Sequence, residues 1–390
     1  MNSRQRNNLR RGVALLLATG LLVIGRTRAQ EPEPPPTKDH PLVEMDLREL
    51  GFKGYENPRT RWPIFVDFTD ANTVALGWLT PANRVAAKHG GALAPAAALL
   101  HVLALDAATG KTQGIGEWPT PTLAVWVLGL RDGRFLTCTG GDLRMFSPDF
   151  KVLCEQNLPN DRSCLKPVRG GVSPSRKTLL LLVPNIQNNG RTLLTDTLLD
   201  LDTFAPVAAS TESPVAREIS DHWMVGGQPP KLCIRGTDQP WRPFPLDSKD
   251  IRALNFVDDD RLAVGSGNDI LVVDINGKVL FQSHVPDHRF AVHFVSSGGE
   301  RFAAIEDRMR GLRSEPLDMY PFASTDRVVV YSIADRRGIY AVKIKGASPW
   351  PGWHSQGHVN EVALSPDGKL LVLVEDSILK VYRLPKDNDH

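Results

Sequence analysis

Few residues of this sequence are spaced for metal or acid–base chemistry. Three histidines lie between residues 284 and 293, and His354 precedes His358 by four residues. On a helix, that spacing would place His354 and His358 on one face, where both could bind a metal ion. Residues 353–359, however, are expected to form a loop, so the sequence predicts no metal site. Because GxSxG, HExxH, Walker and GxGxxG motifs are all missing, no catalytic residue can be designated.

Aromatic and arginine side chains could instead bind a ligand without covalent chemistry. Three Trp-Pro pairs, and a segment at 307–326 that combines arginines with aromatic residues, lie where loops are expected. A Trp next to Pro could equally be a wedge between packed sheets, and an arginine-rich loop could simply be solvated. The residues predicted to bind a ligand are Trp62, Trp118, Arg308, Arg310, Arg313, Tyr320, Trp350 and Trp353.

One fragment is similar to a cofactor-binding element. Residues 104–111 read ALDAATGK and resemble the ALDAxTGK turn of propeller enzymes that use pyrroloquinoline quinone. In those enzymes a Trp follows the Lys closely, whereas here the next Trp is Trp118, and the fragment occurs once. An Asp-x-x-Thr-Gly-Lys element also makes a hairpin turn, so we predict a structural turn and no cofactor.

The four cysteines contain no CxxC pair and no Cys/His spacing typical of zinc. Cys154 and Cys164 flank a polar, turn-rich segment and are predicted to form a disulfide. Cys138 and Cys233 stand in apolar runs and are predicted to be small core residues of strands.

The first 29 residues have the composition of a secretory signal peptide. Arginines precede an apolar run at 12–24, and a short exit ends at Ala29, where cleavage is predicted. A membrane-spanning helix needs about 20 apolar residues, so an anchor is the less favoured alternative. Residues 30–40 would follow as a Pro-rich spacer. We therefore expect export to the periplasm or the extracellular space, and no transmembrane span in the mature form.

The charge balance changes once this leader is removed. The chain of 390 residues has 46 Lys and Arg against 44 Asp and Glu; six of the arginines lie in residues 1–29, so the remainder carries a net charge of −4. A mildly acidic chain without a basic domain does not fit nucleic-acid binding. We expect a monomer whose partner is a protein or a saccharide.

Short β-rich runs separated by turn residues must position all of these side chains. In residues 357–384, alternating apolar residues precede and follow a Pro-Asp-Gly turn, and a third run comes after them. The same order recurs in residues 123–158 and 251–285, and more weakly elsewhere. A repeated four-stranded unit has to stack on its neighbours to bury both faces of its sheet.

The last unit is similar to a WD repeat. Gly357-His358, Ser365–Gly368 and Lys380–Tyr382 resemble the GH opening, the SPDG turn and the closing strand of that family. Arg383 stands where the family usually has Asp. The resemblance implies an all-β fold, a single β-propeller, in which we count seven blades.

The closing strand of the ring is expected to come from the N-terminus. The last blade ends after its third strand, and residues 41–52 carry alternating Val43, Met45 and Leu47. We predict that this segment adds the missing strand and protects an open edge, with a helix as the alternative. The propeller would then span 41–385, followed by a polar tail at 386–390.

Letters a to d denote the strands of a blade from the axis outward; the d–a and b–c connections then share one face. The long insertions at 80–98, 184–193 and 307–326 are predicted b–c loops, and the Trp-Pro pairs are predicted d–a elements. The sequence therefore favours an exported binding or scaffolding protein that uses this face. The alternative is a propeller enzyme, similar to a lactonase or hydrolase or, less favoured, quinone-dependent, with its site at the central channel.

Overall fold

Antiparallel hairpins make up almost all of the regular structure. The computed structural model describes residues 40–52, 64–81, 98–120, 125–139, 141–158, 171–186, 192–210, 214, 216–228, 231–246, 250–285, 289–309, 323–344, 362–375 and 377–386. All of them belong to one unit of the chain, Pro34–His390. Their strands form seven antiparallel sheets, here called blades 1 to 7.

The strands of each blade are given in order along the chain. Blade 1 has β2 (Ile64–Phe68), β3 (Thr73–Pro81), β4 (Ala98–Asp106) and β5 (Thr112–Thr120), and blade 2 has β6 (Val125–Gly129), β7 (Phe135–Thr139), β8 (Asp142–Phe146) and β9 (Val152–Asn157). Blade 3 has β10 (Thr178–Ile186), β11 (Thr192–Asp200) and β12 (Pro206–Ser210), with a bridge from Val172 to Leu179 in place of an inner strand. Blade 4 has β13 (Ala216–Ile219), β14 (Trp223–Gln228), β15 (Lys231–Gly236) and β16 (Arg242–Pro243). Blade 5 has β17 (Ile251–Phe256), β18 (Arg261–Ser266), β19 (Asp269–Asp274) and β20 (Val279–His284). Blade 6 has β21 (Arg289–Ser296), β22 (Arg301–Met309), β23 (Ala323–Ser332) and β24 (Arg337–Lys343). Blade 7 has β25 (Val362–Leu364), β26 (Leu370–Glu375), β27 (Ile378–Arg383) and the N-terminal β1 (Val43–Asp46), which is followed by a 3₁₀ helix, η1 (Leu47–Leu50).

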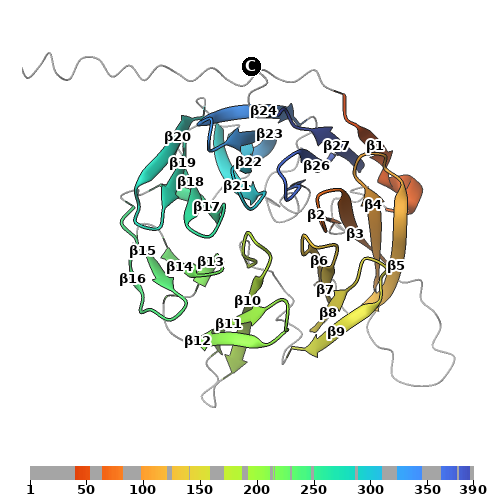
Figure 1. Cartoon of the computed structure of the whole chain (residues 1–390), viewed down its shortest axis with the longest axis horizontal. Helices are drawn as coiled ribbons and strands as arrows, with labels where there is room; N and C mark the ends of the chain where they lie inside the picture. Colours follow the sequence, from red (N-terminus) through yellow and green to blue (C-terminus); the bar gives the residue numbers. More distant parts are fainter. Residues whose placement is uncertain are drawn as a thin grey trace, which may run out of the picture. The chain divides into compact units, whose positions relative to one another are not determined.

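The seven blades stand side by side in a ring (Figure 1). Both faces of a blade are apolar because each face packs on a different neighbour. In β19, Ile270 and Val272 join the cluster shared with blade 6, whereas Leu271 and Val273 join the cluster shared with blade 4. Successive side chains of a strand point to opposite faces, so an unbroken apolar run serves both interfaces. The core is thus a set of layers between blades, and the predicted seven-bladed all-β propeller is confirmed.

The N-terminal strand closes the ring as predicted. β1 pairs antiparallel with β27, with Val43 opposite Val381 and Asp46 opposite Ile378. The alternative prediction was a helix in residues 41–52, and the only helical part of this segment is the single turn of η1. At its start, the Asp46 side chain accepts a hydrogen bond from the backbone N–H of Arg48 at 3.0 Å. Blade 7 therefore joins the first and last strands of the propeller.

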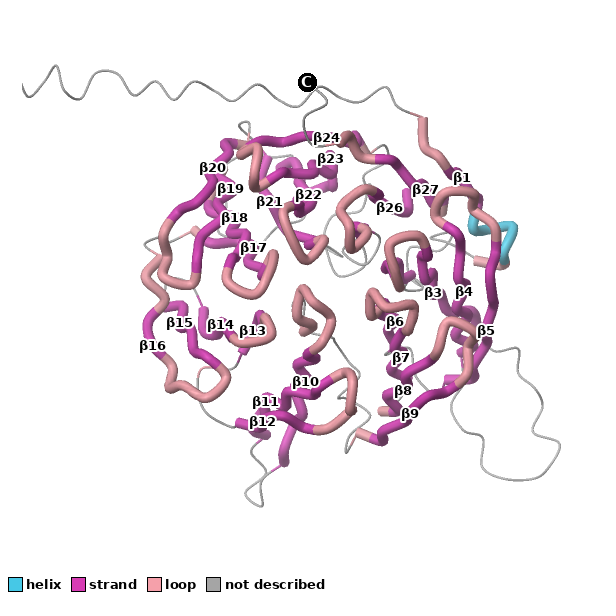
Figure 2. The backbone as a smooth tube through the Cα atoms, in the orientation of Figure 1, coloured by secondary structure: helices cyan, strands magenta, loops and turns pink. Residues whose placement is uncertain are grey.

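The hairpins define two faces of the ring. Strand a of each blade ends at the a–b turn, and strand b then runs back to the b–c connection, so the two kinds of turn lie at opposite ends of a blade. Figure 2 shows the a–b turns gathered around the centre of the ring. The end that carries these turns is called the a–b face, and the opposite end the b–c face.

Candidate functional site

A cavity of about 170 Å³ lies in the central channel, among the inner strands and a–b turns. Its walls are largely apolar and include Phe65, Leu128 and Phe294. Its polar lining comes from strands of blades 1, 5 and 6 and from the a–b turns of blades 2 and 3; the residues are Asp67, Arg131, Ser173, Arg176, Asn255, His293 and Ser296. An apolar cavity with a few convergent polar groups is the usual form of a small-molecule site.

Arg131 reaches across the channel from blade 2 to blade 6. It lies in the turn after β6, with a φ of 70°. Its Nη2 donates to the carbonyl oxygen of Ser296 at 2.8 Å, and its Nη1 donates to the carbonyl oxygen of Ser297. A Cβ on Gly298 would overlap the guanidinium, so glycine is required for this approach. The left-handed backbone of a non-glycine residue costs about 1–3 kcal/mol and is retained where the surrounding structure enforces it.

Arg176 makes a second link between blades that are not neighbours. It lies in the a–b turn of blade 3, also at positive φ, and its Nη2 is 3.0 Å from Oδ2 of Asp67 in blade 1. Asp67 also accepts from the backbone N–H of Phe68 at 2.9 Å and of Gly129 at 3.1 Å. The Asp67 and Arg176 side chains are 10% and 12% exposed, so this ion pair is largely desolvated.

The positive charge at this end of the channel exceeds the negative charge that acts on it. Burial, followed by the like charge of Arg176, lowers the pKa of Arg131 to about 9, and Asp67 offsets only part of this effect. Arg131 therefore still holds its proton at neutral pH. Two guanidinium groups therefore share the charge of Asp67, an arrangement that favours an additional anion.

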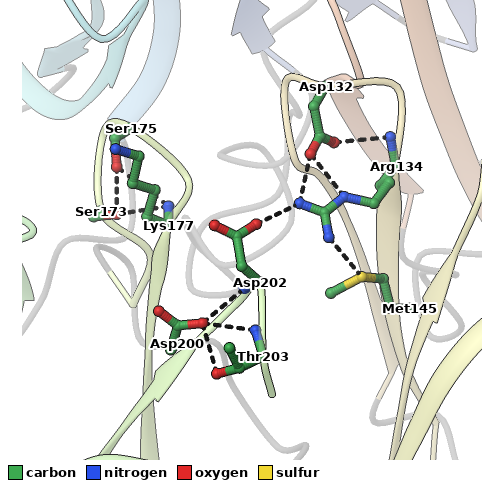
Figure 3. Close-up of polar contacts among 9 residues, drawn as sticks. All are labelled: Asp132, Arg134, Met145, Ser173, Ser175, Lys177, Asp200, Asp202 and Thr203. Carbon is green, nitrogen blue, oxygen red and sulfur yellow. Dashed lines mark hydrogen bonds and ion pairs between the residues drawn. The ribbon is translucent and has the colours of Figure 1, made fainter. Parts of the chain in front are cut away.

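Polar contacts also tie neighbouring blades together at the a–b face. Arg134 of blade 2 donates to Asp202 of blade 3 at 2.7 Å and to Asp132 in its own turn at 2.7 Å (Figure 3). Four further pairs join the next blades in order: Ser175 with Asp221, His222 with Asp259, Arg261 with Glu300, and Arg301 with the carbonyl oxygen of Gly368. These contacts, together called the turn belt, fix the a–b turns that carry Arg131 and Arg176.

The ALDAATGK fragment forms the tight turn between β4 and β5, as expected for a structural element. Oδ1 of Asp106 accepts from the backbone N–H of Thr109 at 2.8 Å and from its hydroxyl at 2.7 Å, which lowers the pKa of the carboxyl. Asp200 and Thr203 make the same two bonds in blade 3 (Figure 3). Within the described residues, the c–d turns of blades 1 and 3 thus share the same Asp–Thr hydrogen bonds.

Comparison with known proteins agrees with the geometry of the ring. Neither a protein-family model nor a curated protein sequence matches the chain. A chain in the crystal structure of a mitotic checkpoint complex has 13% identity and a TM-score of 0.50, covering 93% of this chain and 100% of its own. The Pan2 WD40 domain of Neurospora crassa has 10% identity and a TM-score of 0.52, with coverages of 90% and 98%. This chain has the WD40-type β-propeller fold. At such identities the likeness concerns the fold alone.

Two of the predicted ligand-binding residues, Trp118 and Arg308, are among the described residues. Trp118 lies in β5 and is half-buried against blade 2, with its ring centroid 4.6 Å from that of Phe146 and 6.2 Å from that of Phe150. Arg308 lies in β22, opposite Ser324 of β23. The two residues stand on different blades. The other six lie outside the described residues: Trp62, Arg310, Arg313, Tyr320, Trp350 and Trp353.

The b–c connections differ in length around the propeller. Strands b and c of blades 1, 3 and 6 are separated by residues 82–97, 187–191 and 310–322. In blades 2, 4, 5 and 7 the same strands are joined by two residues. All three long connections therefore leave the b–c face, opposite the turn belt, although these segments themselves lie outside the described residues.

The predicted disulfide between Cys154 and Cys164 is wrong. Cys154 carries a free thiol, as does Cys233, whereas Cys138 is disulfide-bonded; Cys164 lies outside the described residues. Cys154 is in the outermost strand of blade 2, opposite Met145, and burial raises the pKa of its thiol. Cys154 was chosen because it lies close to Cys164 in the sequence, but the described cysteine that forms a disulfide is Cys138.

A further polar cluster lies in blade 1. Nε2 of His101 is 2.8 Å from the Thr80 hydroxyl, its Nδ1 is 2.9 Å from Oε1 of Glu117, and its ring stacks on Trp78. The order of carboxylate, imidazole and hydroxyl matches that of nucleophilic triads. However, Trp78, His101 and Glu117 stand directly opposite one another on β3, β4 and β5, so cross-strand pairing explains the contacts.

Sequence reasoning missed the channel arginines. Arg131 and Arg176 stand in Arg-Asp-Gly and Pro-Ser-Arg turns that read as ordinary hairpins. Both residues lie in predicted a–b turns, next to the innermost part of a blade. This position is the sequence signal that could have predicted arginines at the central channel. Within the described residues, no group of three or more His, Cys, Asp or Glu could hold a metal ion, and no helix is long and apolar enough to cross a membrane.

Proposed function

We propose that this protein is an exported β-propeller that binds or scaffolds a protein or saccharide partner through its b–c face. The observation that carries the proposal is that the strands flanking residues 82–97, 187–191 and 310–322 end at the b–c face of a closed ring, whereas the other b–c connections have only two residues. Binding loops are commonly carried in this way by a rigid framework. Such a protein would act as a monomer and would need no covalent chemistry.

Export is supported by the N-terminal sequence. The arginines, the apolar run and Ala29 have the order of a cleavable leader, and residues 30–40 would separate the new N-terminus from the propeller. We expect a protein expressed with its leader to be recovered outside the cytoplasm with Gln30 as its first residue. Mass spectrometry of the intact product tests this, and an uncleaved chain in the cytoplasm would contradict it.

The predicted ligand residues give the face its chemistry. Trp118 lies near the end of strand d of blade 1, and its ring packs against Phe146 and Phe150 of blade 2. Arg308 is the penultimate residue of β22, just before the connection that carries Arg310, Arg313 and Tyr320. Aromatic rings and guanidinium groups together can hold a saccharide or an acidic protein surface.

Replacement of single connections tests which face binds. In one variant residues 310–322 become Asn-Gly, which restores the two-residue turn of blades 2, 4, 5 and 7. The matched control replaces residues 187–191 of blade 3 in the same way. Each purified protein is applied to a glycan array and to immobilised exported proteins. A ligand bound by the parent and lost in the first variant supports the proposal; a ligand retained when all three connections are shortened refutes it.

The alternative of a propeller enzyme acting at the channel is supported by the polar lining of the cavity, which includes Asp67, Arg131 and His293. A hydrolase or lactonase would use such groups to orient a substrate and move a proton. Turnover of a lactone or ester panel that is abolished by His293→Gln, with the fold retained, would favour this alternative over the binding protein.

A further inference from the structure

The central cavity has the charge and lining of a binding site for a small organic acid. This inference goes beyond the proposed function, because it concerns the channel rather than the b–c face. Two observations carry it: the imbalance of charge at Arg131 and Arg176, and apolar walls on the remaining sides.

The charge imbalance is built into the fold. Arg131 is bonded to two carbonyl oxygens, which are neutral, and Arg176 is paired with Asp67. Within the described residues, Arg131 has no carboxylate within ion-pairing distance. Glu218 is bonded to Asn255 at 3.1 Å, and its charge is not among those that act on Arg131. A cation removed from water without a counter-ion is unfavourable, and an anion in the cavity would supply the missing charge.

The walls restrict the rest of the ligand. Phe65 and Phe294 are 4% and 1% exposed, and they face the same cavity as Leu128 and Val172. Inorganic oxyanions have no apolar part to place against such walls, whereas a carboxylate on a short hydrocarbon or aromatic body does. A volume of about 170 Å³ limits that body to a few carbon atoms or one ring.

We propose that the channel binds a small carboxylate, whose charged group lies against Arg131 and Arg176 and whose apolar body lies between Phe65 and Phe294. Each arginine has guanidinium N–H groups beyond those already used, so it can donate to the ligand and keep its contact with the neighbouring blade. No covalent step is involved.

The first test uses the unaltered protein and pairs of ligands that differ only in charge. Isothermal titration calorimetry at low ionic strength compares the affinity of benzoate with that of benzamide, and the affinity of butyrate with that of butyramide. Sulfate and phosphate are titrated in addition, as anions that have no apolar part. The proposal requires both carboxylates to bind at least tenfold more tightly than their amides and more tightly than the inorganic anions. Equal binding of the amides, no binding of any carboxylate, or binding of sulfate and phosphate alone would each overturn it.

The second test locates the site. Arg131→Gln should weaken benzoate binding by about 10- to 100-fold, the loss expected for hydrogen bonds to a charged group. Arg144→Gln is the matched control, because Arg144 lies in the same blade but pairs with Asp142 and Glu155, does not line the cavity and does not belong to the turn belt. Equal affinities of the two variants for benzoate would overturn the assignment. If Arg131→Gln does not fold, a crystal structure with benzoate decides by whether the carboxylate contacts Arg131. A result here leaves the b–c face untested, so the two proposals fail separately.

Discussion

Deletion of residues 40–52 should destabilise the propeller by a large fraction of its total stability. The segment forms β1 and η1, and its Val43, Leu47 and Phe52 side chains are 7%, 1% and 1% exposed. Burial of a large apolar side chain contributes about 1.5–3 kcal/mol, so the three together contribute roughly 5–9 kcal/mol. Because domains are stable by only about 5–15 kcal/mol, the shortened protein should be close to unfolded at room temperature.

Thermal and urea unfolding of the full-length and shortened proteins, followed by circular dichroism, measure this loss. Two point variants guard against a deletion that does not express. Leu47→Ala should cost about 2–5 kcal/mol and Phe52→Ala about 3–5 kcal/mol, whereas Glu44→Ala, at an exposed position of the same strand, should be within about 0.5 kcal/mol of the parent. An unchanged melting temperature after deletion would show that β1 does not close the ring in solution.

Three further substitutions test the channel, the turn belt and a blade interface. Gly298→Ala places a Cβ against Arg131 at a φ of 86° and should lower the free energy of unfolding by about 1–3 kcal/mol in urea titrations, and a neutral result would mean that Arg131 does not cross the channel. The hydrogen bond to Asp259 raises the pKa of His222, so the pair stabilises fully below the unfolded-state pKa of about 6.5 and loses that effect as pH rises through the folded-state pKa. The difference in melting temperature between the parent and His222→Gln should therefore be largest near pH 5–6 and shrink at higher pH, and a constant difference would contradict the ion pair. Arg327→Met removes the ion-pair partner of Glu306, whose Oε2 lies 2.6 Å from Nε of Arg327 in the interface of blades 5 and 6, and leaves the hydrogen bond that the Tyr331 hydroxyl donates to Glu306. Breaking this buried ion pair should cost about 3–5 kcal/mol by chemical denaturation.

The sequence was sufficient to predict the blades because their signals are local. Pro366-Asp367-Gly368 and Asn276-Gly277 mark tight turns, and apolar runs such as residues 270–273 carry the strands between them. Closure was equally accessible, since a missing fourth strand in blade 7 and an alternating segment before blade 1 match each other. These inferences need only patterns within about ten residues and a count of strands.

The channel site could not be predicted in the same way. Arg131 contacts Ser297 across 166 positions of sequence, and Arg176 contacts Asp67 across 109. Turn propensities do not encode which a–b turns converge at the axis or in which direction their side chains extend. The disulfide prediction failed for a related reason: Cys154 and Cys164 were paired because few residues separate them, whereas bonding depends on the positions and orientations of the two Cα–Cβ vectors.

Changes of sequence have different effects on stability at the two faces of the ring. At the a–b face, a substitution in one turn affects its neighbour, because Arg134, Ser175 and Arg261 each bond to the next blade. At the b–c face, strands b and c are already paired along their length, so a longer connection only increases the entropy of loop closure, by about 0.6 kcal/mol for each doubling. Insertions are therefore inexpensive at the b–c face and disruptive at the a–b face, which explains why blades 1, 3 and 6 lengthen their b–c connections. Variation in partner recognition is expected at the b–c face, and a fixed small-molecule site in the channel below the turn belt.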